Sequence, residues 1–325
     1  MLISSKFLVM VALIVASGAG GYACRRLRLA GDRLAEGLMT VVLVFGYTSV
    51  GFLSIWTMRL QATDAWLPSL GILHILVVTL IGVIVARLMR LGHEETGIFG
   101  IASGASNIGF TMGGFVIYLL LGEAGLGLAS IYSQVLAPMT VLLYYPMARH
   151  YAAAGSAGPS LGRLMLRNLL DWRSLPLPAT IVAVVLSVRA VPRPAIVSQW
   201  NLVDVLMFLV TAMAYFAIGL RLHLGHVRRI WRMIAALAVV RFPLAAGAGL
   251  LLVAATALTP WPLTGVARDV YLIESFVPTA VTMVGVANMF RLQPAEASVL
   301  FVTNTALYLA LVLPLVLPLV MRIFG

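Results

Sequence analysis

Charged side chains are scarce in this sequence. Only 10% of its 325 residues are Asp, Glu, Lys or Arg, whereas 62% are hydrophobic. Soluble domains are roughly 45–50% apolar. Apolar runs long enough to cross the ~30 Å hydrocarbon core of a bilayer recur along the whole chain. The sequence therefore predicts an all-α polytopic membrane protein, because lipid cannot satisfy the backbone groups of other structures.

Two residue types that are almost absent exclude further classes of protein. Cys24 is the single cysteine, which excludes an internal disulfide and a cysteine metal cluster. Lys6 is the single lysine, so no Walker A loop with a lysine beside bound phosphates is present. We expect no cofactor. Uphill transport would have to be driven by an ion gradient (H⁺ or Na⁺), by the membrane potential or by a partner.

Ten apolar segments follow one another along the chain. Their approximate limits are 7–23, 38–58, 67–87, 97–121, 124–148, 177–191, 203–220, 233–257, 270–290 and 296–321. Basic residues are more frequent in the loops after the odd-numbered segments, which places these loops in the cytoplasm. Both termini are then non-cytoplasmic in a multi-pass protein of the cell (inner) membrane. The net charge of +11 comes from these loops, so nucleic acid is not an expected partner.

The two halves of the chain match when the sequence is shifted by 171 residues. Residues 110–114 (FTMGG) then fall on residues 281–285 (VTMVG), and Asn107 falls on Pro278. Each half has five spans, an odd number, so the second half must enter the membrane from the opposite side. We predict ten transmembrane helices in two inverted five-helix repeats, an architecture common in secondary transporters. The repeats are 1–148 and 177–325, joined by a cytoplasmic linker at 149–176.

The fourth and ninth segments carry helix-breaking residues near their middle. Residues 106–109 read SNIG and residues 276–279 read FVPT. A break inside the membrane is tolerated only where protein or a water-filled cavity meets the freed backbone groups. The N-terminus of each half-helix carries about +0.5 charge, so facing breaks would hold an anion. Small residues here can also serve close helix packing, but packing does not explain Asn107 or Pro278.

Several short patterns resemble the auxin efflux carrier family of membrane transport proteins, in a divergent bacterial-type form. They are residues 106–110 (SNIGF), 122–125 (GEAG), 217–220 (AIGL), 240–243 (VRFP), 274–280 (ESFVPTA), 297–298 (AS) and 313–314 (LP). The resemblance implies ten spans, two crossing broken helices, and a transport domain that moves against a scaffold domain in an elevator-like way. It also implies small organic anions, such as carboxylates, as substrates. Met112 and Gly114 depart from the family pattern, which leaves the first crossover and the substrate open.

Polar side chains near the breaks are the expected substrate ligands. Asn107 offers donors and acceptors and can also cap a half-helix, whereas the hydroxyl groups can alternatively bond back to the preceding turn. Arg241 in the eighth segment can bind a carboxylate through two parallel hydrogen bonds. The proposed substrate ligands are Ser106, Asn107, Gly109, Thr111, Arg241, Pro278, Thr279 and Thr282.

Glu274 is the one carboxylate well inside a predicted span, and an ionisable group there is a functional candidate. It can carry a proton, or it can form a fixed ion pair with Arg241. Gln134 and Asn304 are weaker candidates for ion coupling. His74 in the third segment is interpreted as an interhelical hydrogen-bonding residue.

The leading prediction is a secondary active transporter or facilitator of small organic anions by alternating access. A sodium-coupled symporter of the bile-acid type is an alternative, and a membrane sensor is a weaker one. An enzyme is not expected, because the spans hold no nucleophile with a base and no metal cluster. The substrate, the direction of transport, the coupling ion and the oligomeric state are left open, and a homodimer is compatible with the sequence.

Overall fold

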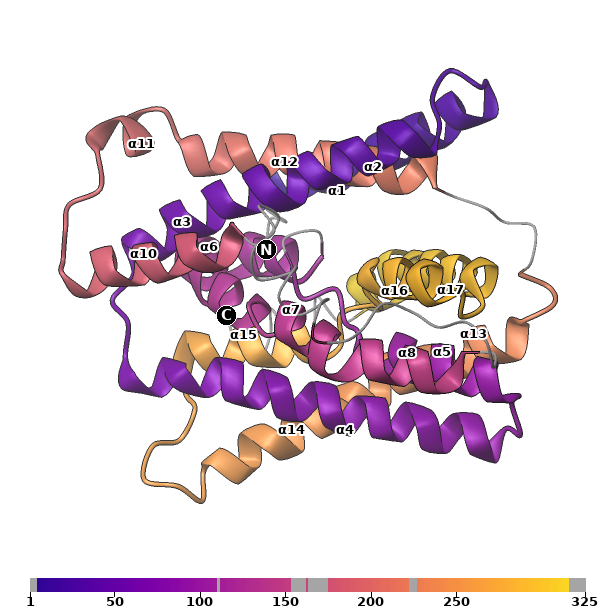
Figure 1. The fold of residues 1–325 in the computed structure, drawn as a ribbon. Coiled ribbons are helices and arrows are strands. Elements are labelled where there is room, and N and C mark those ends of the chain that lie inside the picture. The colour runs from indigo at the N-terminus through magenta and orange to yellow at the C-terminus, as the bar shows by residue number, and fades with distance from the viewer. Residues whose placement is uncertain (1–4, 110–111, 153–161, 163–174, 222–226, 316–325) are drawn as a thin grey trace. The chain divides into compact units, whose positions relative to one another are not determined.

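The structure, a computed structural model, describes residues 5–109, 112–152, 162, 175–221 and 227–315. These residues form helices joined by turns, and no β-strand is found among them (Figure 1). The prediction of an all-α chain is confirmed. Helices satisfy their own backbone hydrogen bonds, as lipid requires.

Six helical stretches in the described part are long and apolar enough to cross a membrane. They are Arg33–Trp56, Ala62–Leu88, Gly113–Tyr151, Leu202–Leu220, Trp231–Thr256 and Pro294–Leu315, and Pro176–Val188 is a shorter apolar helix. The stretch Gly113–Tyr151 is bent at Gly122, which has φ 66° and ψ −157°. An L-residue rarely adopts this conformation, so glycine is required at the bend. The bend separates the fourth and fifth segments where the sequence predicts their boundary.

The chain divides into two compact units, and each draws segments from both halves of the sequence. Unit 1 comprises Met1–Ala62, Gly109–Ile131 and Asn168–Leu222, and unit 2 comprises Thr63–Ile108, Tyr132–Arg167 and His223–Gly325.

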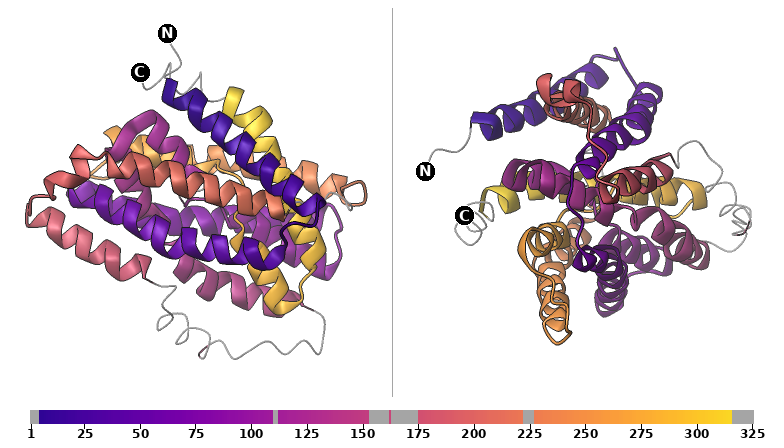
Figure 2. Two further views of the ribbon diagram at one scale, coloured as in Figure 1. Left: turned by 90° about the horizontal axis from the view of Figure 1, so that it is seen from above. Right: turned by 90° about the vertical axis from the view of Figure 1, so that its left-hand side faces the viewer.

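Unit 1 is built around α1 (Ser5–Arg26) and α12 (Leu202–Leu220), which lie side by side (Figure 1 and Figure 2). A Cβ atom at Gly21 would meet the Phe216 carbonyl, and one at Gly219 would meet the Gly18 carbonyl. Glycine at both positions lets the two backbones approach closely, as in other small-residue helix interfaces. The other elements of this unit are α2 (Asp32–Val41), η1 (Val42–Gly46), α3 (Tyr47–Trp56), α10 (Pro176–Val188), α11 (Ala195–Gln199) and the first part of α6 (Gly113–Ser133).

Unit 2 is built around α4 (Trp66–Leu88), which packs against α5 (His93–Gly104) and α14 (Ala245–Thr256). The Nε2 of His74 in α4 donates to the carbonyl oxygen of Ala245 over 3.0 Å, which agrees with an interhelical role. The remaining elements are η2 (Ala62–Ala65), α7 (Leu136–Met139), η3 (Thr140–Tyr144), α8 (Tyr145–Tyr151), α13 (Trp231–Val239), η5 (Val240–Leu244), α15 (Gly265–Ser275), α16 (Thr282–Phe290), α17 (Pro294–Leu307) and η6 (Tyr308–Val312).

Two features of unit 2 position the candidate site. The helix α5 ends at Gly104 and α15 ends at Ser275, and irregular backbone follows each end. The segment η5 is a π-helical turn with Pro243 inside it. Because proline cannot donate a helical hydrogen bond, the wider turn accommodates it. This turn carries Arg241, which is fully buried.

Candidate functional site

The two helix breaks of unit 2 pair with each other through their main chains. The N–H of Asn107 donates to the carbonyl oxygen of Pro278 over 2.7 Å, and the N–H of Ala280 donates to that of Ala105 over 2.6 Å. Ser106 and Thr279 form an isolated antiparallel bridge between these contacts. We call residues 105–108 and 276–280 the crossover. Backbone groups that the breaks release are thus satisfied within the protein, as a buried backbone demands.

Thr279 ties the crossover to two helices. Its Oγ1 donates to the carbonyl oxygens of Ala102 (2.7 Å) and Ala105 (3.1 Å). Its N–H donates to Oδ1 of Asn304 in α17 over 2.9 Å. Carbonyl groups at a helix C-terminus have no partner in their own helix, and here the side chain of another segment supplies one.

Arg241 satisfies carbonyl groups from both breaks. Its Nη1 donates to the carbonyl oxygen of Ser103 over 3.0 Å, and its Nε donates to that of Val277 over 3.1 Å. Its Nη2 also donates to the Val277 carbonyl. Ser103 lies in the last turn of α5, and Val277 follows the end of α15. A cation is favourable at a helix C-terminus, so the guanidinium group stabilises both broken ends.

Several buried polar groups near the crossover have no hydrogen-bond partner among the described residues. They are Oγ of Ser106, Nδ2 of Asn304 and both carboxylate oxygens of Glu274. Ser106 and Glu274 are fully buried, and Asn304 is 1% exposed. A polar group that is buried without a hydrogen-bond partner lowers the stability of the protein. These groups are therefore the candidates for hydrogen bonds to a bound molecule or ion.

The other sequence-based candidates lie in different surroundings. Asn107 is buried in the crossover, and Thr282 is half-buried at the start of α16. Gln134 is half-buried between α6 and α7. Gly109 belongs to unit 1 and accepts from the N–H of Gly114. Thr111 lies outside the described residues. In unit 2 the structure therefore brings together Ser106, Asn107, Arg241, Pro278, Thr279 and Asn304.

A protein-family model described as a membrane transport protein matches residues 7–317, nearly the whole chain. The chain belongs to this family. The resemblance to auxin efflux carriers is thereby confirmed. With its apolar helices, the transporter is a multi-pass membrane protein. No curated protein sequence matches it.

The sequence allows two interpretations of Arg241 and Glu274 in this transporter, a fixed ion pair or separate roles. Among the described residues, the two form no hydrogen bond, and both Glu274 oxygens are unpartnered. The guanidinium group instead faces main-chain carbonyls. Sequence reasoning could not find these partners, because every residue has a main-chain carbonyl group. Which carbonyl groups lack a donor in their own helix depends on where the helices end in the folded structure.

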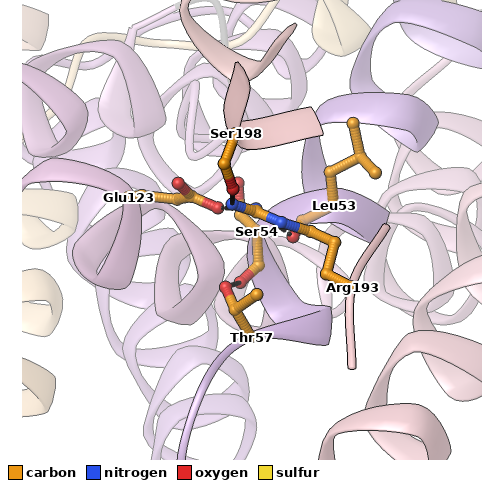
Figure 3. A network of polar contacts seen from close by, with 6 residues as sticks. All are labelled: Leu53, Ser54, Thr57, Glu123, Arg193 and Ser198. Atoms are coloured by element: carbon orange, nitrogen blue, oxygen red, sulfur yellow. Dashed lines mark hydrogen bonds and ion pairs between the residues drawn. The ribbon is translucent and has the colours of Figure 1, made fainter. Parts of the chain in front are cut away.

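A second polar network, in unit 1 of the transporter, was also missed by sequence reasoning (Figure 3). Arg193 donates to the carboxylate of Glu123, to the Leu53 carbonyl over 3.1 Å and to Oγ of Ser198 over 3.2 Å. Glu123 follows the bend at Gly122. The network therefore joins this bend to α3 and to α11. The pattern GEAG at residues 122–125 was its only signal in the sequence.

Proposed function

We propose that this transporter is a secondary carrier or facilitator of small organic anions of the carboxylate type, and that it holds them at the crossover. The observation that carries the proposal is the set of unsatisfied buried donors there, Ser106 Oγ and Asn304 Nδ2. The Arg241 guanidinium, which bonds carbonyl groups of both breaks, adds a positive charge. A guanidinium has five N–H donors, and three nitrogens each use one on carbonyl groups. Two donors therefore remain for a guest.

Charge favours an anion over a neutral or cationic guest. Arg241 is fully buried and has no ionised partner within hydrogen-bond reach among the described residues. A buried charge is costly unless an opposite charge offsets it, and a carboxylate guest would do so through charge-assisted hydrogen bonds. The N-terminus of α16, which follows the crossover at Thr282, adds partial positive charge.

Residue spacing supports the two inverted five-helix repeats, 1–148 and 177–325. Asn107 contacts Pro278, and His74 contacts Ala245, and both pairs are separated by 171 positions. The ends of α5 at Gly104 and α15 at Ser275 are separated by the same number. In a structure with a pseudo-two-fold axis, residues near the axis contact their own equivalents. These contacts are therefore those expected of inverted repeats, which secondary transporters often use.

The crossover lies in unit 2, so we propose that unit 2 is the moving body of an elevator-like alternating-access cycle. Hydrogen bonds from Asn107, Thr279 and Arg241 connect its broken helices, and such connections favour movement as one body. Unit 1 would form the static scaffold, through which a homodimer can form. The distribution of arginines supports a cell (inner) membrane topology in which both termini are non-cytoplasmic.

A stability screen of the purified full-length protein tests this proposal. We expect a small carboxylate to raise the melting temperature, because a ligand at 100 times its Kd stabilises by about 2.7 kcal/mol. The Asn304→Leu variant should lose this response, whereas Asn288→Leu should keep it, because the Asn288 side-chain amide donates to the Val284 carbonyl of its own helix, α16. Carboxylates that stabilise should then be taken up by proteoliposomes.

Each arm of the screen is run in sodium and in choline buffer. Stabilisation that requires sodium would favour the sodium-coupled symporter of the bile-acid type. A screen in which organic cations or neutral solutes stabilise the protein and no carboxylate does would overturn the anion proposal.

A further inference from the structure

We infer that Glu274 is a proton-binding residue and that, with Tyr132, Tyr271 and Tyr308, it forms a proton site adjacent to the substrate site. The inference deepens the proposed function, because it names the coupling ion of the same carrier. The coupling of proton uptake to substrate binding rests on the anion proposal. The proton site itself is inferred from the surroundings of Glu274 alone.

Glu274 is fully buried in the last turn of α15, and neither carboxylate oxygen has a hydrogen-bond partner among the described residues. An ionised carboxylate in such surroundings loses its hydration and gains no donor in return. A protonated carboxyl group does not carry this penalty. The surroundings of Glu274 therefore favour its protonated form. Several N–H donors to the carboxylate would instead favour the ionised form.

Three tyrosines share the same property. The hydroxyl groups of Tyr132, Tyr271 and Tyr308 are buried and have no hydrogen-bond partner among the described residues. Glu274 lies close enough to Tyr132 and Tyr308 to interact electrostatically with each. The rings of Tyr132 and Tyr271 are 5.9 Å apart, and Tyr271 lies one turn before Glu274 in α15. A hydroxyl group donates and accepts, so it can serve either protonation state of the carboxyl group.

The charged and titratable groups around this cluster come from several elements. Arg241 comes from η5, Tyr308 from η6 and Tyr144 from η3. His74 comes from α4, where its Nε2 donates to the Ala245 carbonyl and its ring lies 6.1 Å from that of Tyr271. Of these groups, Arg241 is the one that carries a permanent charge.

Arg241 gives a reason for coupling. It interacts electrostatically with Glu274 without a hydrogen bond between them. One buried positive charge can offset one negative charge, either ionised Glu274 or a bound carboxylate. When the carboxylate enters, Glu274 must take up a proton for the region to remain neutral. One proton therefore accompanies one bound carboxylate group.

Asn304 connects the two sites. Its Oδ1 accepts from the N–H of Thr279 in the crossover, whereas its Nδ2 is buried without a partner. Tyr308 lies four residues later, on the same side of the helical turn. Substrate binding at the crossover can therefore affect the proton site, and protonation can affect the crossover, through the side chain of Asn304.

A sodium ion suits the cluster less well than a proton. Sodium would have to bind beside the permanent charge of Arg241, and the Nδ2 group of Asn304 is a donor that repels cations.

Infrared spectroscopy of the full chain in lipid tests the proton site without any substrate. We expect a protonated-carboxyl band that appears reversibly as pH falls, shifts on [¹³C]glutamate labelling and is missing in Glu274→Gln. It should persist in the control Glu296→Gln, whose carboxylate lies at the start of α17. The variant Tyr308→Phe should shift the position of the band, because the carboxyl group loses a nearby hydroxyl dipole with which it interacts electrostatically, whereas Tyr151→Phe should not.

The outcomes separate the possibilities. Labelling of the wild-type protein identifies a glutamate band even if Glu274→Gln does not fold. A band absent at every pH, or present without change at every pH, would overturn the inference. So would a band that sodium removes and choline does not, because sodium then occupies the site. A carboxylate screen without a hit, together with a titrating Glu274, would instead refute the proposed function alone.

Discussion

The main-chain N–H of Asn107 lies 2.7 Å from the carbonyl oxygen of Pro278, and this contact joins two helix breaks that are 171 residues apart in the sequence. Because the contact uses only the main chain, it does not depend on which side chain stands at position 107. The residue type at position 107 can then be tested separately from the pairing of the breaks.

Replacement of Asn107 with leucine should abolish uptake of the carboxylate found by the stability screen, while expression stays near normal. The main-chain hydrogen bond to Pro278 remains in this variant, but the amide group at the break is lost. Uptake by proteoliposomes measures the effect, with Asn288→Leu as the control. Unchanged uptake would remove Asn107 from the substrate site.

Thr279→Val should lower the free energy of unfolding by about 1–3 kcal/mol, because the carbonyl groups of Ala102 and Ala105 lose a buried donor. The change preserves the shape of the side chain. Thr303→Val is a matched control, since the Thr303 hydroxyl bonds within its own helix. Thermal unfolding in detergent compares the two variants. Equal melting temperatures would mean that the Thr279 hydroxyl does not hold the crossover.

Arg241→Lys should lower uptake by about tenfold or more, although the positive charge is retained. The planar guanidinium group of arginine donates to the carbonyl groups of Ser103 and Val277 at the same time. The compact ammonium group of lysine cannot reproduce this arrangement of donors. The loss of one or two charged hydrogen bonds corresponds to this size of effect. A lysine variant with the uptake of the wild type would show that charge alone matters at this position.

How much of this site follows from sequence depends on the residue. Proline, glycine and asparagine inside apolar runs predict the breaks near residues 106–109 and 276–279, because each weakens a helix locally. Which main-chain groups pair is a property of the crossing in space, so sequence could not supply the Ala280–Ala105 contact. The three tyrosines around Glu274 gave no signal, since a tyrosine within an apolar run is read as ordinary core.

Glu274→Gln should flatten the pH dependence of uptake. If substrate entry requires a protonated Glu274, uptake by the wild type should fall as pH rises, whereas glutamine mimics the protonated form at every pH. Initial rates over a series of pH values provide the measurement, with Glu296→Gln as the control. A variant that keeps the wild-type pH profile would assign Glu274 a structural role.

Gly122→Ala should destabilise the protein by about 1–3 kcal/mol, because an alanine at φ 66° and ψ −157° is strained. A Cβ atom would meet no other atom there within 4 Å, so the effect would come from the backbone alone. Gly247→Ala is the matched control, since position 247 is equally open but lies within α14. Similar melting temperatures for both variants would contradict the strain argument.

The guanidinium group of Arg241 donates hydrogen bonds to carbonyl groups from both sides of the crossover. If the α5 end and the α15 end moved apart, a desolvated cation would lose its acceptors, so the two ends should keep their mutual distance whichever face of the membrane the site is open to. Spin labels placed on the two half-helices would then report one constant separation through the whole cycle, and flexibility would have to lie in the connections outside them.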